Sequence, residues 1–187
     1  MNIKETLISI TRELEQCLQQ IDTEQMADVT VALQKANRIF VYGTGRSLLM
    51  IRAFAMRLMH LGHTVYVVGE TNTPAISEQD ILIIASGSGE TKTLVTIAEK
   101  CKKLQVPLAL ITTDPSSTIA RLADYIIQIH TSTSKTNHQE QASVQPGGNT
   151  FEQSLLLLTD AWIVQMFAQS DIQQQNQALM KQHANLE

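Results

Sequence analysis

The chain has 187 residues and a formal net charge of −4, with 43% apolar and 17% charged residues. This composition is typical of a globular domain with a sizeable core, and it excludes an intrinsically disordered chain. The net negative charge argues against a nucleic-acid-binding surface.

The cysteines and the N-terminus restrict the class of protein further. Cys17 and Cys101 are far apart in the sequence, which indicates reduced thiols with neither a disulfide framework nor a metal-binding spacing. The first residues contain no apolar signal segment, and no apolar run is as long as a membrane span. We therefore expect a single cytoplasmic domain over residues 1–187, with no membrane partner and no nucleic-acid partner.

Residues 1–36 are predicted to form a helical extension. Apolar residues recur at helical intervals over 3–17 and again over 26–33. Asp22 lies between these stretches, in a pattern typical of a helix end followed by the cap of a new helix. The two amphipathic helices pack either on the core of their own chain or on a partner subunit, and periodicity does not decide between these alternatives.

Strands alternate with helices through residues 37–168. Apolar runs predict strands at 38–42, 64–68, 81–85, 107–111 and 125–129. Helices are predicted at 48–60, from the turn after the third strand to about 104, from Ser116 or Ser117 to Leu122, and over about 150–168. This alternation predicts an α/β fold with a doubly wound, five-stranded parallel sheet flanked by helices.

Two segments lie outside this alternation, a polar stretch without periodicity and a weakly helical tail. Residues 130–148 are polar and are predicted to form a long loop. Residues 169–187 form a glutamine-rich tail, to which we assign no function. The helix between them has a wide apolar face, which suits packing on the sheet and on a second chain.

A glycine-rich turn follows the third predicted strand. Ser86, Gly87, Ser88 and Gly89 come directly after the apolar run 81–85, and a helix follows. The start of a helix has unpaired N–H groups and a partial positive charge, so it attracts anions. The hydroxyl groups in and after the turn add donors, and the expected ligand is a phosphomonoester.

Two familiar phosphate-binding motifs do not match this turn. Lys92 follows Thr91 and not a glycine, so the turn is not a Walker loop, and the third glycine of a dinucleotide fingerprint is missing. Thr91 adds a third hydroxyl beside Ser86 and Ser88. The alternative interpretation is a turn whose serines and glycines only cap the helix.

A second glycine turn, with Gly45, Arg46 and Ser47, follows the first predicted strand. Ligands of doubly wound sheets bind beyond the carboxyl ends of strands, where both turns lie. The sequence therefore predicts one pocket between them. Arg46 either neutralises charge on a bound ligand or forms a surface ion pair.

Five segments together resemble the 6-phospho-3-hexuloisomerases of the sugar isomerase (SIS) domain family: 41–47, 53–60, 67–75, 86–91 and 151–154. The resemblance covers about residues 35–165 and implies the SIS fold, with a flavodoxin-like strand order. It implies interconversion of D-arabino-hex-3-ulose 6-phosphate and fructose 6-phosphate, after formaldehyde has been fixed onto ribulose 5-phosphate. It also implies a homotetramer with sites near subunit interfaces and neither a metal nor an organic cofactor.

The resemblance also implies roles for single residues. The phosphate would bind at Ser86, Ser88 and Thr91, with Ser47 as a supporting donor. Moving a carbonyl from C3 to C2 requires a base near the carbon, and SIS isomerases commonly use a glutamate at the start of the helix after the polar loop. This position is Glu152.

Each catalytic hypothesis has an alternative. Glu152 also ends the sequence Asn149-Thr-Phe-Glu152, which matches a capping box that would lower its pKa. Glu90, in the turn of the third strand, is a rival base. His60 and His138 are candidate proton relays, because related isomerases take a histidine from a neighbouring subunit, whereas a histidine among apolar neighbours is more often packed.

The chain departs from the family pattern just before Glu152. The family usually has Gln-Pro-Met-Gly-Ser/Thr-Leu-Phe-Glu, whereas here Gly147 replaces the methionine and Asn149-Thr150 replace the hydroxyl-leucine pair. We expect the lost apolar packing to loosen this loop. Two alternatives remain open: an SIS isomerase for another sugar phosphate, and a sugar-phosphate sensor without catalysis.

Overall fold

The computed structural model describes residues 2–131, 143–167 and 185. His138 and almost all of the predicted tail lie outside these residues. The helices are α1 (Ile3–Leu18), α2 (Thr23–Lys35), α3 (Gly45–His60), α4 (Lys92–Lys103) and α5 (Asn149–Phe167). The strands are β1 (Ile39–Gly43), β2 (Val65–Val67), β3 (Ile81–Ala85), β4 (Leu108–Thr112) and β5 (Tyr125–Gln128).

All five predicted strands are present, each within one residue of its predicted ends. They form one parallel sheet in the order β2-β1-β3-β4-β5, which confirms the doubly wound sheet and the flavodoxin-like order. The order changes direction between β1 and β3, and Gly43 at the end of β1 pairs with Ala85 at the end of β3. These two strand ends are the switch point where such sheets bind ligands.

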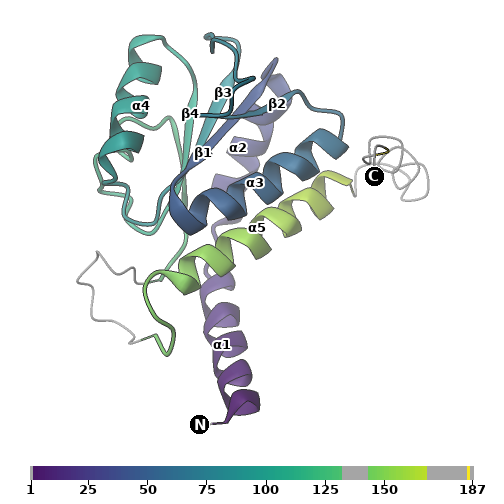
Figure 1. Ribbon diagram of the computed structural model, residues 1–187, viewed down its shortest axis with the longest axis vertical. Coiled ribbons are helices and arrows are strands. Elements are labelled where there is room, and N and C mark those ends of the chain that lie inside the picture. Colours follow the sequence, from purple (N-terminus) through teal and green to yellow (C-terminus); the bar gives the residue numbers. More distant parts are fainter. Residues whose placement is uncertain (1, 132–142, 168–184, 186–187) are drawn as a thin grey trace.

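Both faces of the sheet are buried, which explains the uninterrupted apolar runs. Side chains such as Val41 and Ile83 pack in a core with α1, α2, α3 and α5. Their neighbours Leu82 and Ile84 pack in a second core with α4. Figure 1 shows α4 on one side of the sheet and α3 and α5 on the other.

The two N-terminal helices pack differently. α2 lies against the sheet of its own chain, with Val29 and Leu33 fully buried. α1 projects away from the sheet, and only its later turns meet α5 (Figure 1). Ile3 and Leu7 in its first turns are 76% and 56% exposed. Its packing on a partner subunit stays a prediction. None of the described helices combines the length and apolarity needed to cross a lipid bilayer.

The prediction of a short helix from Ser116 or Ser117 to Leu122 is wrong. Residues 115–122 form a series of turns, in which Ser117 Oγ accepts a hydrogen bond from Ala120 N. The amides that follow Ser117 are used by the neighbouring turn: Thr118 N donates to the Glu90 carboxylate and Ile119 N donates to the carbonyl of Gly89. Tertiary contacts therefore set this backbone, and local helix propensity does not.

Candidate active site

A cavity of about 160 Å³ lies at the switch point of the sheet. The turns after β1 and β3 and the start of α5 form its wall, so the two predicted glycine turns do meet at one pocket. The lining residues are Thr44, Ser47, Ala85, Ser86, Gly87, Ser88, Thr91, Gly148, Phe151 and Glu152.

The peptide between Gly87 and Ser88 is held in one orientation. The carbonyl of Gly87 accepts hydrogen bonds from Thr113 N (3.0 Å), Thr112 Oγ1 (3.0 Å) and Thr113 Oγ1 (2.8 Å). Because a trans peptide is planar, the N–H of Ser88 points away from these threonines. The end of β4 thereby fixes a backbone donor in the turn that lines the cavity.

The hydroxyl groups of this turn are also fixed. Ser86 Oγ accepts from Gly89 N (3.2 Å), and Ser88 Oγ accepts from Glu90 N (3.3 Å). Each oxygen is used as an acceptor in these bonds, so its O–H hydrogen is available to donate. Two oriented hydroxyl donors therefore line the same wall as the backbone amide.

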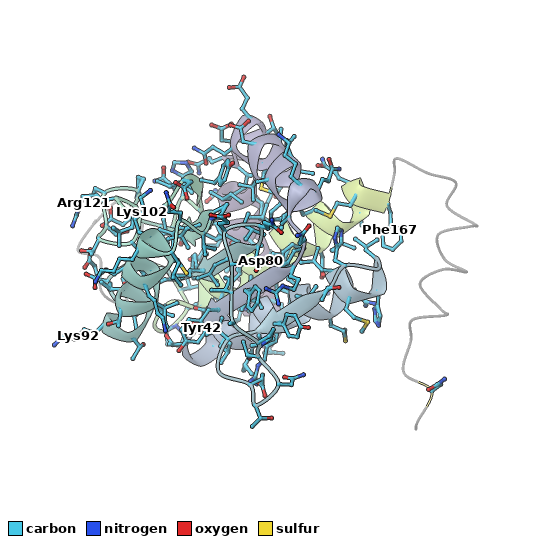
Figure 2. All side chains as sticks on the ribbon, turned by 90° about the horizontal axis from the view of Figure 1, so that it is seen from above. Tyr42, Asp80, Lys92, Lys102, Arg121 and Phe167 are labelled. Atoms are coloured by element: carbon cyan, nitrogen blue, oxygen red, sulfur yellow. The ribbon has the colours of Figure 1, made fainter. Side chains whose placement is uncertain are left out.

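Two helix N-termini converge on the cavity. Thr44 precedes α3 and Thr91 precedes α4, and neither side chain caps its helix within the part of the chain that the structure describes. The first N–H groups of each helix then have no partner within the helix, and the helix dipole makes both ends electropositive. Lys92 points outward into solvent (Figure 2), unlike a Walker-loop lysine. An anion in this cavity would therefore meet backbone amides and hydroxyls and not this lysine.

Glu152 brings a carboxylate to the same cavity. Its side chain is 16% exposed, and its Oε2 lies 3.5 Å from Arg46 Nε. Burial raises the pKa of Glu152 above its ordinary value, and the positive charge of Arg46 partly opposes this rise. A carboxylate with a raised pKa in a cleft is suited to accept and return a proton.

The capping box that competed with this role is not formed among the described residues. Asn149 is already the first residue of α5, and its Oδ1 accepts a hydrogen bond from Arg46 Nη1. The amide of Glu152 donates to the carbonyl of Gly148 (3.2 Å). Arg46 therefore makes an ion pair and a hydrogen bond with the first turn of α5 at the edge of the cavity, and its side chain is 42% exposed.

Gly45 and Gly89 were predicted to bind substrate, but neither lines the cavity. Gly89 has a φ of 59°, and a Cβ there would lie 2.0 Å from Ser117 Oγ. Glycine at this position thus permits the turn to pack on Ser117. Gly45, with a φ of 57°, begins α3 and is exposed.

Glu90 and His60 also lie away from the cavity. Glu90 is exposed, and its Oε1 accepts from Thr118 N (2.6 Å). His60 is the last residue of α3, roughly 20 Å along the helix from Ser47 at a rise of 1.5 Å per residue. It is 6% exposed, with Nδ1 3.5 Å from Arg57 Nη1. The packed interpretation is favoured, and a relay role in a neighbouring subunit stays a prediction.

Sequence reasoning missed four lining residues, Thr44, Ala85, Gly148 and Phe151. Each is next in the sequence to a predicted site residue or to Gly147, where the chain departs from the family pattern. Its place beside such a residue was the signal that could have identified it. Phe151 is 2% exposed, and its apolar side chain in a helical pattern indicates only an ordinary core residue. Among the described residues, no three histidine, cysteine or acidic side chains lie close enough together to hold a metal ion.

Comparison with known proteins places this site in a family. The SIS domain model matches residues 32–168. The chain is 38% identical over 187 residues to the 3-hexulose-6-phosphate isomerase of Bacillus subtilis (strain 168), which covers 100% of both chains. It is 40% identical over 186 residues to the enzyme of the same name from Mycobacterium gastri, which covers 100% of this chain and 92% of the other.

A solved structure agrees with these sequence matches. The crystal structure of a Methanococcus jannaschii protein, for which a 3-hexulose-6-phosphate isomerase function was inferred, has a TM-score of 0.83 at 31% identity. The match covers 98% of this chain and 99% of that one. The chain therefore belongs to the SIS domain family, and these relatives of similar length carry the name 3-hexulose-6-phosphate isomerase.

Proposed function

We propose that the protein interconverts D-arabino-hex-3-ulose 6-phosphate and fructose 6-phosphate. The observation that carries this proposal is the pairing of an anion site and a carboxylate of raised pKa in one cavity. The first suits a phosphate, and the second suits proton transfer at carbon. The names of the relatives that match over the whole chain support the same reaction.

The phosphate binds at the starts of α3 and α4. Ser86, Ser88 and Thr91 donate their hydroxyl hydrogens to its oxygens, and Ser47 donates from the first turn of α3. The free amides of both helices and the fixed N–H of Ser88 add further donors. This end of the cavity holds the substrate without taking part in bond changes.

Glu152 is the base. Its carboxylate takes the proton from C2 of the hexulose, the C–H electron pair forms the C2–C3 double bond, and the carbonyl electron pair moves to O3. The proton of the O2 hydroxyl passes to the O3 oxyanion. The C2–O2 carbonyl then forms as the electron pair of the double bond takes the proton on Glu152 back to C3, which leaves fructose 6-phosphate and an ionised Glu152.

Arg46 supports this chemistry from the edge of the cavity. Its guanidinium lies beside Glu152 and remains partly exposed, so it can also face a bound oxyanion. A fixed positive charge near the enediolate stabilises the negative charge that develops on oxygen. The same charge favours the ionised form of Glu152, which is the form that accepts the proton.

The finer parts of the proposal concern cellular context. The reaction would follow fixation of formaldehyde onto ribulose 5-phosphate in the ribulose monophosphate route. We further propose that the enzyme works in the cytoplasm as a homotetramer. The exposed apolar side chains on α1 and on α5, such as Leu7 and Val164, favour self-association because water contact of such surface is unfavourable.

A coupled assay tests the proposal. Ribulose 5-phosphate, formaldehyde and a separate hexulose-phosphate synthase supply the substrate, and fructose 6-phosphate is followed with and without the protein. Product that depends on the protein is the expected result. If no product forms while fructose 6-phosphate still binds, the site serves another sugar phosphate or a sensor, and the proposed reaction is rejected.

A further inference from the structure

A polar seam joins α1 to the first turns of α5, and Figure 1 shows where the two helices meet. Glu13 Oε1 accepts a hydrogen bond from Thr150 Oγ1 at 2.8 Å. Ser154 Oγ donates to Cys17 Sγ at 3.4 Å. Within each helix the two members are four residues apart, so the two pairs lie one turn apart on facing sides. The seam therefore fixes the register of α1 against α5.

Thr150 also connects the seam to the segment before α5. Its hydroxyl lies 3.4 Å from Gln145 Nε2 and 3.2 Å from Ser143 Oγ, and Gln145 N donates to Ser143 Oγ at 3.0 Å. The hydroxyl thus gives its hydrogen to Glu13 and accepts from two groups, which uses its full hydrogen-bonding capacity. Thr150 is only 2% exposed. The hydroxyl of Thr150 therefore links the segment 143–148, which includes a lining residue, to α1.

The seam lies behind the carboxylate of the cavity. Glu152 comes two residues after Thr150 and two residues before Ser154. At 100° per residue, its side chain leaves α5 on the side opposite to both. The cavity and the seam therefore occupy opposite faces of the same turn. Any shift of that turn against α1 moves Glu152 relative to the phosphate site.

Stability alone does not account for a carboxylate in the seam. Glu13 Oε2 is buried and has no hydrogen-bond partner among the residues that the structure describes. A buried charged oxygen without a donor lowers stability, and an apolar side chain that fills the same space costs less. Glu13 is thus costly to bury, and what it provides is the bond that orients Thr150.

We propose that Glu13, acting through Thr150, is a positioning residue for Glu152. This inference rests on the proposed function, because it assigns α1 a part in the same reaction. Glu13 is not among the residues that line the cavity. Its loss should therefore lower turnover and leave phosphate binding intact, since a displacement of about 1 Å at a reacting group can cost roughly 100-fold in rate.

Three variants on α1 and α5 test the inference. Glu13→Ala should lower kcat about 10- to 100-fold with KM nearly unchanged. Glu13→Gln should recover most of the loss, because its amide oxygen can still accept from Thr150. Thr150→Val removes the hydroxyl at similar volume and should match Glu13→Ala. Glu15→Ala is the matched control, because Glu15 lies on the exposed side of the same helix. All rates are measured well below each variant's melting temperature.

Equal kcat values for Glu13→Ala and Glu15→Ala would overturn the inference. Losses that add up in a double variant of Glu13 and Thr150 would do the same, because residues acting through one bond are not additive. Amide hydrogen exchange over 148–152 gives a readout without turnover, and faster exchange is expected only for Glu13→Ala and Thr150→Val. If the wild type itself lacks turnover, the proposed function fails, and unchanged exchange in those variants would separately reject the positioning role.

Discussion

The first two helices and the next two begin in opposite ways. Asn2 Oδ1 accepts from Glu5 N (3.0 Å), and the Glu5 carboxylate accepts from Asn2 N (2.8 Å) at the start of α1. Asp22 Oδ1 accepts from Glu24 N (2.8 Å) at the start of α2. Within the described residues, α3 and α4 have no side-chain cap. Caps are thus present away from the cavity and missing beside it.

Residue type does not explain this difference. Thr44 and Thr91 stand at the cap positions of α3 and α4, and threonine is a competent cap residue. Their side chains line the cavity instead. The first amides of both helices therefore stay available to a ligand. Leaving them uncapped lowers the stability of the fold, and a cap from the threonine side chain would remove this loss. In this chain, the capped ends of α1 and α2 stabilise the fold, and the uncapped ends of α3 and α4 lie where we propose that the phosphate binds.

Replacing the carboxylate of the cavity should have the largest effect. Glu152→Gln removes the proposed base and keeps the shape of the side chain, so kcat should fall about 100- to 10,000-fold. Binding of fructose 6-phosphate should remain, because the uncapped helix ends are untouched. The coupled assay measures turnover, and isothermal titration with fructose 6-phosphate measures binding.

Glu90→Gln is the matched control for this change. Glu90 lies between the lining residues Ser88 and Thr91, but its carboxylate accepts from Thr118 N and Glu90 does not itself line the cavity. Turnover close to that of the wild type is expected. The reverse pattern, with Glu90→Gln inactive and Glu152→Gln active, would transfer the role of base to Glu90.

Adding a cap to α4 should raise the stability of the fold and weaken binding of the sugar phosphate. Thr91→Asp supplies a carboxylate that can accept from the first amides of α4, and a negative charge there also matches the helix dipole. The free energy of unfolding should rise by about 0.5–1 kcal/mol. Binding of fructose 6-phosphate should weaken roughly 10-fold or more, because its phosphate meets a like charge and occupied amides. Urea unfolding and titration calorimetry measure the two effects.

Thr91→Asn separates the cap from the charge. Asparagine caps as well as aspartate does but adds no negative charge, so it should give a similar gain in stability and a smaller loss of binding. Unchanged binding in both variants would mean that the start of α4 does not hold the phosphate. Lower stability in both would mean that the cap geometry is unavailable at Thr91.

Local sequence patterns predicted most of the fold because most of it is locally determined. The run 81–85 is apolar throughout since both faces of β3 are buried, and glycine turns follow β1 and β3 where the chain reverses. The position of Ser86, Ser88 and Thr91 at the cavity was predictable for the same reason, because these residues belong to the turn after β3. The place of Glu152 at the cavity was predictable through the family resemblance and not through its own neighbours in the sequence, and its role as base stays a proposal.

Contacts between distant residues account for what the sequence did not reveal. The helix expected at 116–122 does not form, because the amide of Thr118 donates to Glu90, which lies 28 positions earlier in the chain. Gly89 resembled a phosphate-binding glycine, but Ser117 is the side chain that excludes a Cβ there. Glu13 and Thr150 are 137 positions apart, and no periodicity in either helix indicates that they bond.

Removing a cap far from the cavity should affect only stability. Asp22→Ala deletes the side chain that accepts from Glu24 N and Gln25 N at the start of α2. The free energy of unfolding should fall by about 0.5–2 kcal/mol, while kcat and KM stay at wild-type values. Thermal unfolding and the coupled assay check both parts. A changed kcat or KM under conditions in which the variant is fully folded would show that α2 also affects the site.

The smallest effect should be a pH-dependent cost of keeping Glu152 in the cavity. Burial raises its pKa in the folded chain above the ordinary value of 4.5, so the ionised form is less favourable folded than unfolded. Below the unfolded pKa both states are protonated, and Glu152→Gln and the wild type should be equally stable. As pH rises through the folded pKa, the wild type loses stability relative to the variant, and urea unfolding between about pH 4 and pH 8 measures that difference. A variant that becomes the less stable one as pH rises would show that Arg46 outweighs burial, and the carboxylate would then form a structural ion pair with Arg46.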